Sequence, residues 1–154
     1  MRPTPLLTAA LLAAALGACV HPPSPGGGSG AGAVRARAAR RCELVRTLVQ
    51  EPVPARLLQE VAPAQGPAPV MVFLRQEGLL ERFLEEDAAC GDSHFSVQRE
   101  SAGEALVLYL EPAPDGSFSY EARRSSAEAL VLEGKPTGRL SPAQAGWLTV
   151  GDSP

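Results

Sequence analysis

The stretch Ala105-Leu106-Val107-Leu108-Tyr109-Leu110 is a continuous apolar run in the second half of a 154-residue chain. Shortly after it, Ser117-Phe118-Ser119-Tyr120-Glu121-Ala122 alternates in the way expected of a strand with one buried face. The segment between them, Pro112-Ala113-Pro114-Asp115-Gly116, is rich in turn-forming residues. Together these three segments predict a hairpin of two antiparallel strands.

Two further segments extend the strand pattern on either side of this hairpin. Phe95-Ser96-Val97-Gln98-Arg99 alternates in the same way, and residues 129–132 are again apolar. Short turn-rich segments, Ser101-Ala102-Gly103 and Arg123-Arg124-Ser125-Ser126, separate neighbouring strands. Four consecutive strands with short loops predict an antiparallel meander.

The residues before the strands have helical spacing. Apolar residues recur at intervals of three and four over residues 34–50, namely Val34, Ala38, Cys42, Val45 and Val49. A short second helix is expected after Glu51-Pro52, with Pro54 in its first turn and Leu57, Leu58 and Val61 on one face. These patterns predict two helices in the first half of the chain.

Residues 70–89 allow two interpretations. Val70-Met71-Val72-Phe73 could begin a strand, but one helical face accommodates Phe73, Leu74, Leu80, Phe83 and Leu84. We predict a third helix, which Gly91 would end. Near the C-terminus, Ser141-Pro142-Ala143-Gln144 has the residues of a helix start, so we expect a short helix that buries Trp147. The predicted fold is α+β, with two to three N-terminal helices on one face of the four-stranded meander.

The N-terminus has the anatomy of a signal peptide. Arg2 is followed by an apolar core over residues 6–16, which is too short to span a membrane. The core ends in Leu16-Gly17-Ala18-Cys19, which resembles the lipobox of bacterial lipoproteins. This resemblance implies cleavage before Cys19, lipidation of its thiol and acylation of the new amino terminus by a chain such as palmitate. The alternatives are ordinary secretion with cleavage near Ala15 and an uncleaved leader.

The resemblance also implies where the protein resides and how its chain is divided. Val20 occupies the position in which inner-membrane lipoproteins often carry Asp, so we expect the protein on the outer membrane, facing the periplasm. A leader of residues 1–18 would precede a tether of residues 19–34, rich in Pro, Gly and Ser, and one domain of residues 35–150. As a flexible coil, such a tether reaches roughly 20 Å.

Lipid on Cys19 would leave an even pair of thiols, Cys42 and Cys90. Because an exported protein enters an oxidising compartment, we predict a disulfide between them. Two separate buried thiols are the alternative.

Charge is distributed unevenly along the chain. The 14 basic and 17 acidic side chains give a formal net charge of −3, which argues against a nucleic-acid-binding protein. Five arginines nevertheless cluster just after the expected tether: Arg35, Arg37, Arg40, Arg41 and Arg46. We hypothesise that they contact anionic lipid headgroups or another phosphate-bearing envelope component. The alternative is a solvated helix end whose arginines pair with carboxylates of the domain.

Two polar segments contain residue types that occur in reactive sites. Gly91-Asp92-Ser93-His94 echoes the Gly-Asp-Ser start of one esterase family, but adjacent side chains of an extended segment point to opposite faces. We expect a turn there, in which Asp92 or Ser93 accepts hydrogen bonds from backbone amides. Glu85-Glu86-Asp87 lacks the spacing of a calcium loop, and the two histidines lack partners for zinc. We therefore expect no metal, no cofactor and no catalytic set.

A second resemblance covers residues 115–148. Asp115-Gly116-Ser117-Phe118-Ser119-Tyr120-Glu121, a strand ending at Gly134 and Leu140-Ser141-Pro142-Ala143-Gln144 resemble the back half of a family of small bacterial lipoprotein domains of unknown function. The Cys-Pro-x-Tyr segment of that family has no counterpart in this chain. This resemblance implies a topology but no activity.

These observations lead to one functional expectation and one alternative. We expect a non-catalytic lipoprotein that is held to the membrane through Cys19 and binds another envelope protein. The alternative is an anchored inhibitor of a periplasmic hydrolase, such as a lysozyme or a protease, with residues 112–116 as the protruding loop. An enzyme ranks third, because no nucleophile and base pair is recognisable in the sequence.

Overall fold

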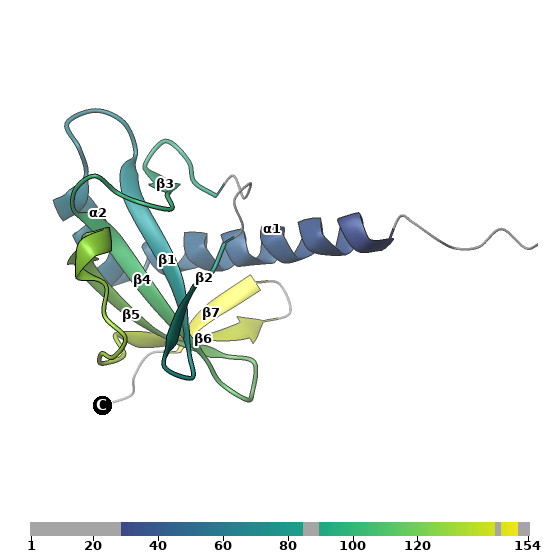
Figure 1. The fold of residues 1–154 in the computed structure, drawn as a ribbon. Helices are drawn as coiled ribbons and strands as arrows, with labels where there is room; N and C mark the ends of the chain where they lie inside the picture. Colours follow the sequence, from purple (N-terminus) through teal and green to yellow (C-terminus); the bar gives the residue numbers. More distant parts are fainter. Residues whose placement is uncertain (1–28, 85–89, 144–145, 151–154) are drawn as a thin grey trace, which may run out of the picture.

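The computed structural model describes residues 29–84, 90–143 and 146–150 (Figure 1). Two helices and seven strands give the α+β fold that the sequence predicts. In chain order the elements are α1 (Ser29–Val49), α2 (Pro52–Val61), β1 (Ala68–Gln76), β2 (Leu79–Arg82), β3 (Phe95–Val97), β4 (Ala105–Pro112), β5 (Phe118–Ser125), the 3-10 helix η1 (Ala127–Ala129), β6 (Gly138–Ala143) and β7 (Gly146–Val150).

The strands form one mixed sheet in the order β2-β1-β4-β5-β6-β7, with β3 beside the start of β1. Strands β4, β5, β6 and β7 are antiparallel in sequence order, so the predicted hairpin of β4 with β5 is confirmed. Strand β1, however, pairs with both β3 and β4 in parallel. The predicted meander of only four antiparallel strands is therefore wrong, because β1 takes the place beside β4 that the segment of residues 95–99 was expected to fill.

The helix predicted for residues 70–89 is also wrong. Residues 70–76 belong to β1, which turns back as β2, and residues 85–89 lie outside the described part of the chain. Strand β1 is central and has apolar side chains on both faces, so its sequence lacks the alternation that identifies a strand with one solvated face. A short apolar run of this kind has no period that distinguishes a strand from a buried helix.

Two expectations for the C-terminal part are corrected as well. The apolar segment of residues 129–132 is not a strand, since its first residue is the last of η1 and the others belong to an irregular connection to β6. The helix expected from Ser141 is replaced by the hairpin of β6 and β7, in which Ala143 pairs with Gly146. Pairing of β6 with β5 outweighs the local capping pattern. The side chain of Trp147 lies outside the described part, so its predicted burial stays a prediction.

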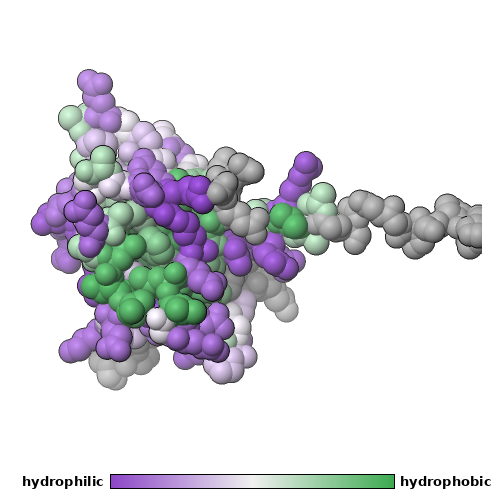
Figure 2. Space-filling view, in the orientation of Figure 1, coloured by the Kyte–Doolittle hydropathy of each residue, from purple (hydrophilic) through white to green (hydrophobic). Residues whose placement is uncertain are grey.

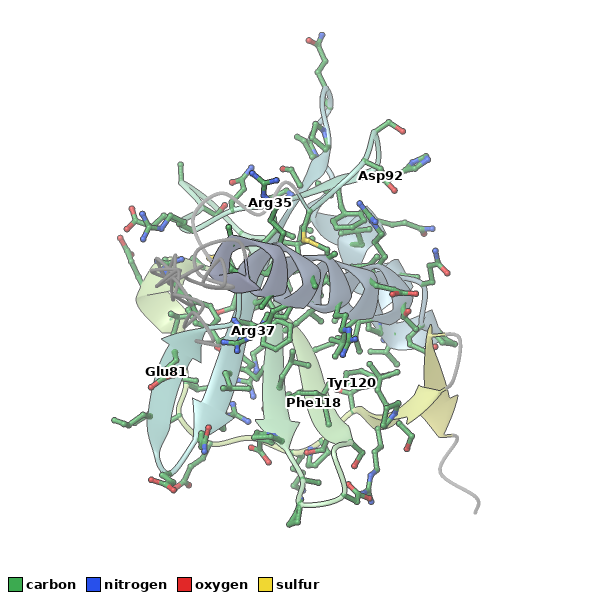
Figure 3. The ribbon with its side chains drawn as sticks, turned by 90° about the vertical axis from the view of Figure 1, so that its right-hand side faces the viewer. Arg35, Arg37, Glu81, Asp92, Phe118 and Tyr120 are labelled. Atoms are coloured by element: carbon green, nitrogen blue, oxygen red, sulfur yellow. A yellow bond between two sulfur atoms is a disulfide. The ribbon has the colours of Figure 1, made fainter. Side chains whose placement is uncertain are left out.

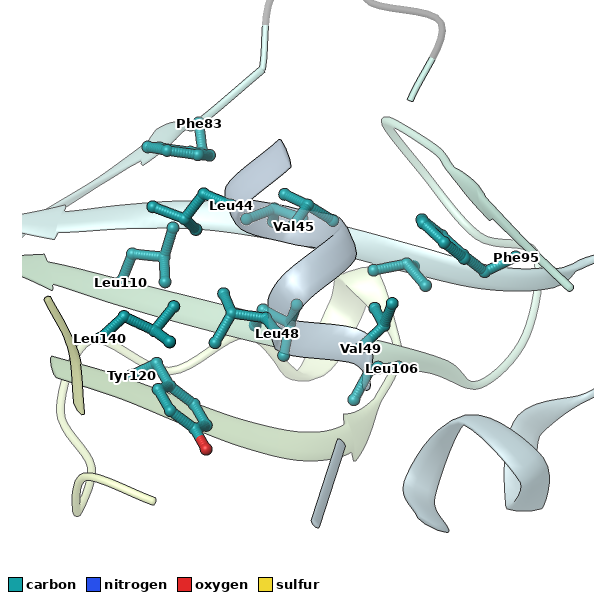
Figure 4. Packing of buried hydrophobic residues seen from close by; sticks show 13 residues of the cluster. Leu44, Val45, Leu48, Val49, Phe83, Phe95, Leu106, Leu110, Tyr120 and Leu140 are labelled. Carbon is teal, nitrogen blue, oxygen red and sulfur yellow. The ribbon is translucent and has the colours of Figure 1, made fainter. Parts of the chain in front are cut away.

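Both helices cover one face of the sheet, as predicted. The main core lies between the helices and the sheet, and Figure 4 shows the α1 side chains facing those of the strands. Its fully buried members include Leu44, Val45 and Leu48 from α1, Val70 from β1, Leu106, Leu108 and Leu110 from β4, and Leu140 from β6. The predicted α2 face is confirmed, because Leu57, Leu58 and Val61 pack against this core.

Helix α1 is longer than the sequence predicts. It begins at Ser29, so the last residues of the expected tether are helical. Residues 31–37 are exposed throughout, and the first buried position of α1 is Cys42. The N-terminal half of α1 therefore projects beyond the body of the protein (Figure 1). Neither described helix combines the length and apolarity that crossing a membrane requires.

A disulfide joins Cys42 to Cys90, which confirms the predicted bridge. The two Cα atoms are 5.2 Å apart, and both residues are buried. The bridge connects the middle of α1 to the segment that leads into β3. The backbone N–H of Val97 donates a 3.1 Å hydrogen bond to the carbonyl of Cys90, which ties that segment to β3.

Candidate binding site

The face of the sheet opposite the helices combines an apolar layer with a buried ion-pair cluster. Because side chains alternate along a strand, Met71 and Phe73 of β1 lie on this face, and Arg75 continues their row. Tyr109 of β4 pairs in register with Phe73 on one side and with Glu121 of β5 on the other. The row thus changes from apolar to charged towards the β1–β2 turn.

Arg75 is the centre of the cluster. Its Nη1 donates hydrogen bonds to Glu121 Oε2 at 3.0 Å and to Glu111 Oε1 at 3.1 Å. Its guanidinium carbon lies 4.5 Å from the centroid of the Tyr109 ring. Arg123, two residues after Glu121 on β5, also forms an ion pair with Glu121. The Nε of Arg75 is a buried donor without a partner in the described structure.

The connection from β5 to β6 lies over this cluster and is held to the sheet by hydrogen bonds. The N–H of Val131 donates to the Tyr109 hydroxyl at 3.2 Å, and Arg75 Nη2 donates to the Val131 carbonyl at 3.3 Å. At Gly134 a Cβ would collide with the Glu121 carboxylate, so only glycine allows the backbone to pass this close. Both side chains of the Arg75–Glu121 pair are buried beneath this connection.

Beside the cluster lies an open groove with a volume of about 680 Å³. It lies between the turn joining β1 to β2, the end of β4 and the β5–β6 connection. Its lining residues are Arg75, Gln76, Glu77, Gly78, Glu111, Pro112, Leu132, Glu133 and Gly134. Figure 2 shows an apolar patch on the same side of the molecule, between the β5–β6 connection and β2.

One leucine that lines the groove is unusually exposed. Leu132 is 52% exposed, whereas Leu79 of β2 pairs with Gln76, one position from the Arg75–Leu80 pair, and so lies on the other face of the sheet. An exposed apolar patch beside a groove is typical of a surface that binds another molecule. The arrangement provides apolar contact next to fixed charges.

The five arginines of the predicted cluster do not form one surface. Arg35, Arg37, Arg40 and Arg46 are exposed, and Figure 3 shows Arg35 and Arg37 on opposite sides of α1. Arg41 instead packs against the body, where its guanidinium donates a 2.8 Å hydrogen bond to the Phe83 carbonyl and lies over the Phe83 ring. The cluster therefore divides into one structural arginine and four exposed cations.

The loop of residues 112–116 is exposed and held by hydrogen bonds. Asp115 Oδ1 accepts hydrogen bonds from the Ser117 N–H at 3.0 Å and from the Ser117 hydroxyl at 2.5 Å. Arg139 forms a 2.6 Å ion pair with Asp115 Oδ2. A loop that inserts into an enzyme would need such support, so the inhibitor alternative retains a plausible element and stays a prediction.

These contacts give Asp115 a pH-dependent role. The Ser117 hydroxyl and N–H hold the pKa of Asp115 below its usual value, helped by the charge of Arg139 and opposed by partial desolvation. A carboxyl with a lowered pKa stabilises the fold above its unfolded pKa of about 3.9 and loses this effect as the pH falls through the folded pKa. The difference in urea midpoint between wild type and Asp115→Asn should therefore shrink on acidification.

The measurement is urea unfolding of both proteins from neutral pH to about pH 2, which lies below the ordinary pKa of an aspartate. A Ser117→Ala variant, which lacks the hydroxyl donor, should show a smaller pH-dependent effect. A difference of constant size between wild type and Asp115→Asn over the whole range would contradict the prediction.

The turn predicted at Gly91-Asp92-Ser93-His94 is confirmed. Asp92 Oδ1 accepts hydrogen bonds from the N–H groups of His94 at 2.7 Å and Phe95 at 3.2 Å, and these bonds lower the pKa of Asp92. The segment leads into β3. His94 is exposed beside α2 and has no hydrogen-bonded hydroxyl partner within the described residues.

Other predicted positions lie outside the described residues. These are Cys19 with the signal peptide, and the acidic segment Glu85-Glu86-Asp87. Within residues 29–84, 90–143 and 146–150, no three His, Cys, Asp or Glu side chains are grouped as metal ligands. The cluster of Arg75, Tyr109, Glu111 and Glu121 was not predicted from the sequence. The available signal was an arginine at the end of an apolar run. Because a helix was predicted for residues 70–89, Arg75 was not placed on a strand of the sheet.

We compared the chain with protein-family models, with curated proteins and with solved structures, and none of them matches. The features of this chain that point to a function are therefore the geometry of the groove and the N-terminal sequence.

Proposed function

We propose that this chain is a lipid-anchored envelope protein whose body is a non-catalytic binding domain. The observation that carries the binding function is the groove beside Arg75. Its lining residue Arg75 is held by a buried ion pair, and the exposed Leu132 is also among its lining residues. A surface that is fixed before binding loses less conformational entropy on association.

The groove is better suited to a protein segment than to a small molecule. Small-molecule sites are mostly enclosed and lined by apolar side chains. Here the groove is open and most of its lining residues are polar or charged. We therefore expect an envelope protein as the partner and no cofactor.

The anchor and α1 would place this domain near the membrane. Lipid on Cys19 would hold the chain to the membrane, and several acyl chains would make this attachment effectively permanent. Helix α1 begins at Ser29, ten residues after Cys19, and carries the exposed Arg35, Arg37 and Arg40. Their positive charge would favour anionic headgroups by roughly 1 kcal/mol each at the surface.

Photocrosslinking in the native envelope tests the proposal. A photoreactive residue in place of Leu132 should give a discrete crosslinked product with another envelope protein. The matched control replaces Val53, an apolar residue of α2 that is 37% exposed and lies away from the groove. The control should not give that product.

A Cys19→Ser variant, which cannot receive lipid, should leave the membrane fraction and lose most of the crosslink. The absence of a product from position 132, or identical products from positions 132 and 53, would refute the binding domain. Retention of the Cys19→Ser variant in the membrane fraction would refute the lipid anchor.

A further inference from the structure

The groove carries two exposed carboxylates whose charge is not offset within the described structure. Glu77 is in the turn that joins β1 to β2, and Glu133 is in the β5–β6 connection. Both line the groove, and neither forms an ion pair with a described residue. Two separate parts of the chain therefore each place a negatively charged side chain at the groove.

The arginine of the groove does not neutralise these carboxylates. The positive charge of Arg75 is already shared between Glu111 and the buried Glu121. The lining contains one arginine and three glutamates, while Lys135 follows Gly134 in the chain without lining the groove. The groove is therefore negative, and complementarity favours a cationic occupant.

An exposed leucine makes the occupant more specific. Leu132 is adjacent to Glu133 in the chain and lines the groove with it. A free cation would gain nothing from this apolar surface. A peptide segment with a basic side chain next to an apolar one could contact both the carboxylates and Leu132.

We propose that the groove binds a basic and apolar segment of a partner protein, with a Lys or Arg side chain at Glu77 and Glu133 and an apolar neighbour on Leu132. This inference rests on the proposed binding function and specifies the chemistry of the partner. It would be wrong, with the binding function intact, if position 132 crosslinks to a protein that does not bind through basic residues.

Selection from short random peptides displayed on phage tests the proposal. The target is the full-length chain with Cys19→Ser, and clones that also bind the Glu77→Gln/Glu133→Gln variant are removed. The remaining clones should be enriched in Lys or Arg next to Leu, Ile, Val or Phe. Synthetic peptides from these clones should bind the double variant about tenfold more weakly, as expected for the loss of two exposed charge contacts.

The matched control is Glu100→Gln/Glu128→Gln, which removes two exposed glutamates that do not line the groove. This control variant should bind the peptides like wild type. A Leu132→Ser variant should bind them more weakly than wild type. Equal thermal unfolding midpoints of wild type and all variants would show that the fold is preserved. The proposal is overturned if no clone depends on Glu77 and Glu133, if dependent clones lack basic residues, or if the groove instead mediates self-association that the double variant abolishes.

Discussion

Replacing both Cys42 and Cys90 by Ser is expected to lower the free energy of unfolding by about 4 kcal/mol. The bridge closes a loop with a sequence separation of 48 residues, and opening it restores conformational freedom mainly to the unfolded chain. Small domains have a net stability of roughly 5 to 15 kcal/mol, so the loss should be visible at once. Urea unfolding of wild type and variant at neutral pH measures it.

Reduction of the wild-type protein provides the control for this prediction. It opens the same loop but retains both sulfur atoms in the core, so its urea midpoint should fall close to that of the double variant. A loss below about 1 kcal/mol in both proteins would contradict the chain-entropy argument. Two free thiols in the unreduced native protein would contradict the bridge itself.

Replacing Glu121 by Gln is expected to cost about 3 kcal/mol of stability, at the lower end of the range for breaking a buried ion pair. The side chains of Arg75 and Glu121 are only 7% and 8% exposed. Without the Glu121 charge, Arg75 would retain only the pair with the half-exposed Glu111. Equilibrium unfolding in urea measures the loss.

The exposed pair Glu104–Arg124 offers a matched control for the buried pair. Its ends are 3.2 Å apart and about half exposed, so Glu104→Gln should cost no more than about 1 kcal/mol. The double change Arg75→Met/Glu121→Gln should recover part of the loss, because it removes the uncompensated charge together with its partner. Similar costs for Glu121→Gln and Glu104→Gln would show that burial does not strengthen the pair.

Local patterns predicted those elements in which burial alternates or recurs with a regular period. The α2 face, the strand character of β4 and β5, and the turn at Asp92 are confirmed because each has its own periodic or turn signal. Strand β1 and the β6–β7 hairpin were assigned as helices. In both cases pairing with another strand decides the conformation. The partner of β1 is β4, which is distant in sequence, and the pairing of β6 with β7 is not visible in the local residue pattern.

The candidate site was less predictable than the fold. Arg75 lies 36 residues before Glu111 and 46 before Glu121, and only the parallel pairing of β1 with β4 brings them together. The exposed basic residues of α1 were recognisable as a cluster, but their division between Arg41 and the others was not. That division depends on where the body of the protein ends along α1.

The sequence by itself determined the α+β class with helices on one sheet face, and it favoured a disulfide between Cys42 and Cys90. The first follows from local periodicity and the second from the resemblance to lipoproteins, which sets Cys19 aside. Neither needs knowledge of distant contacts. Only the tertiary structure decided the mixed sheet, the ion-pair cluster under the β5–β6 connection and the groove beside it. The free energy of strand pairing and of burying Arg75 with Glu121 arises between segments far apart in the chain, so no local pattern encodes it.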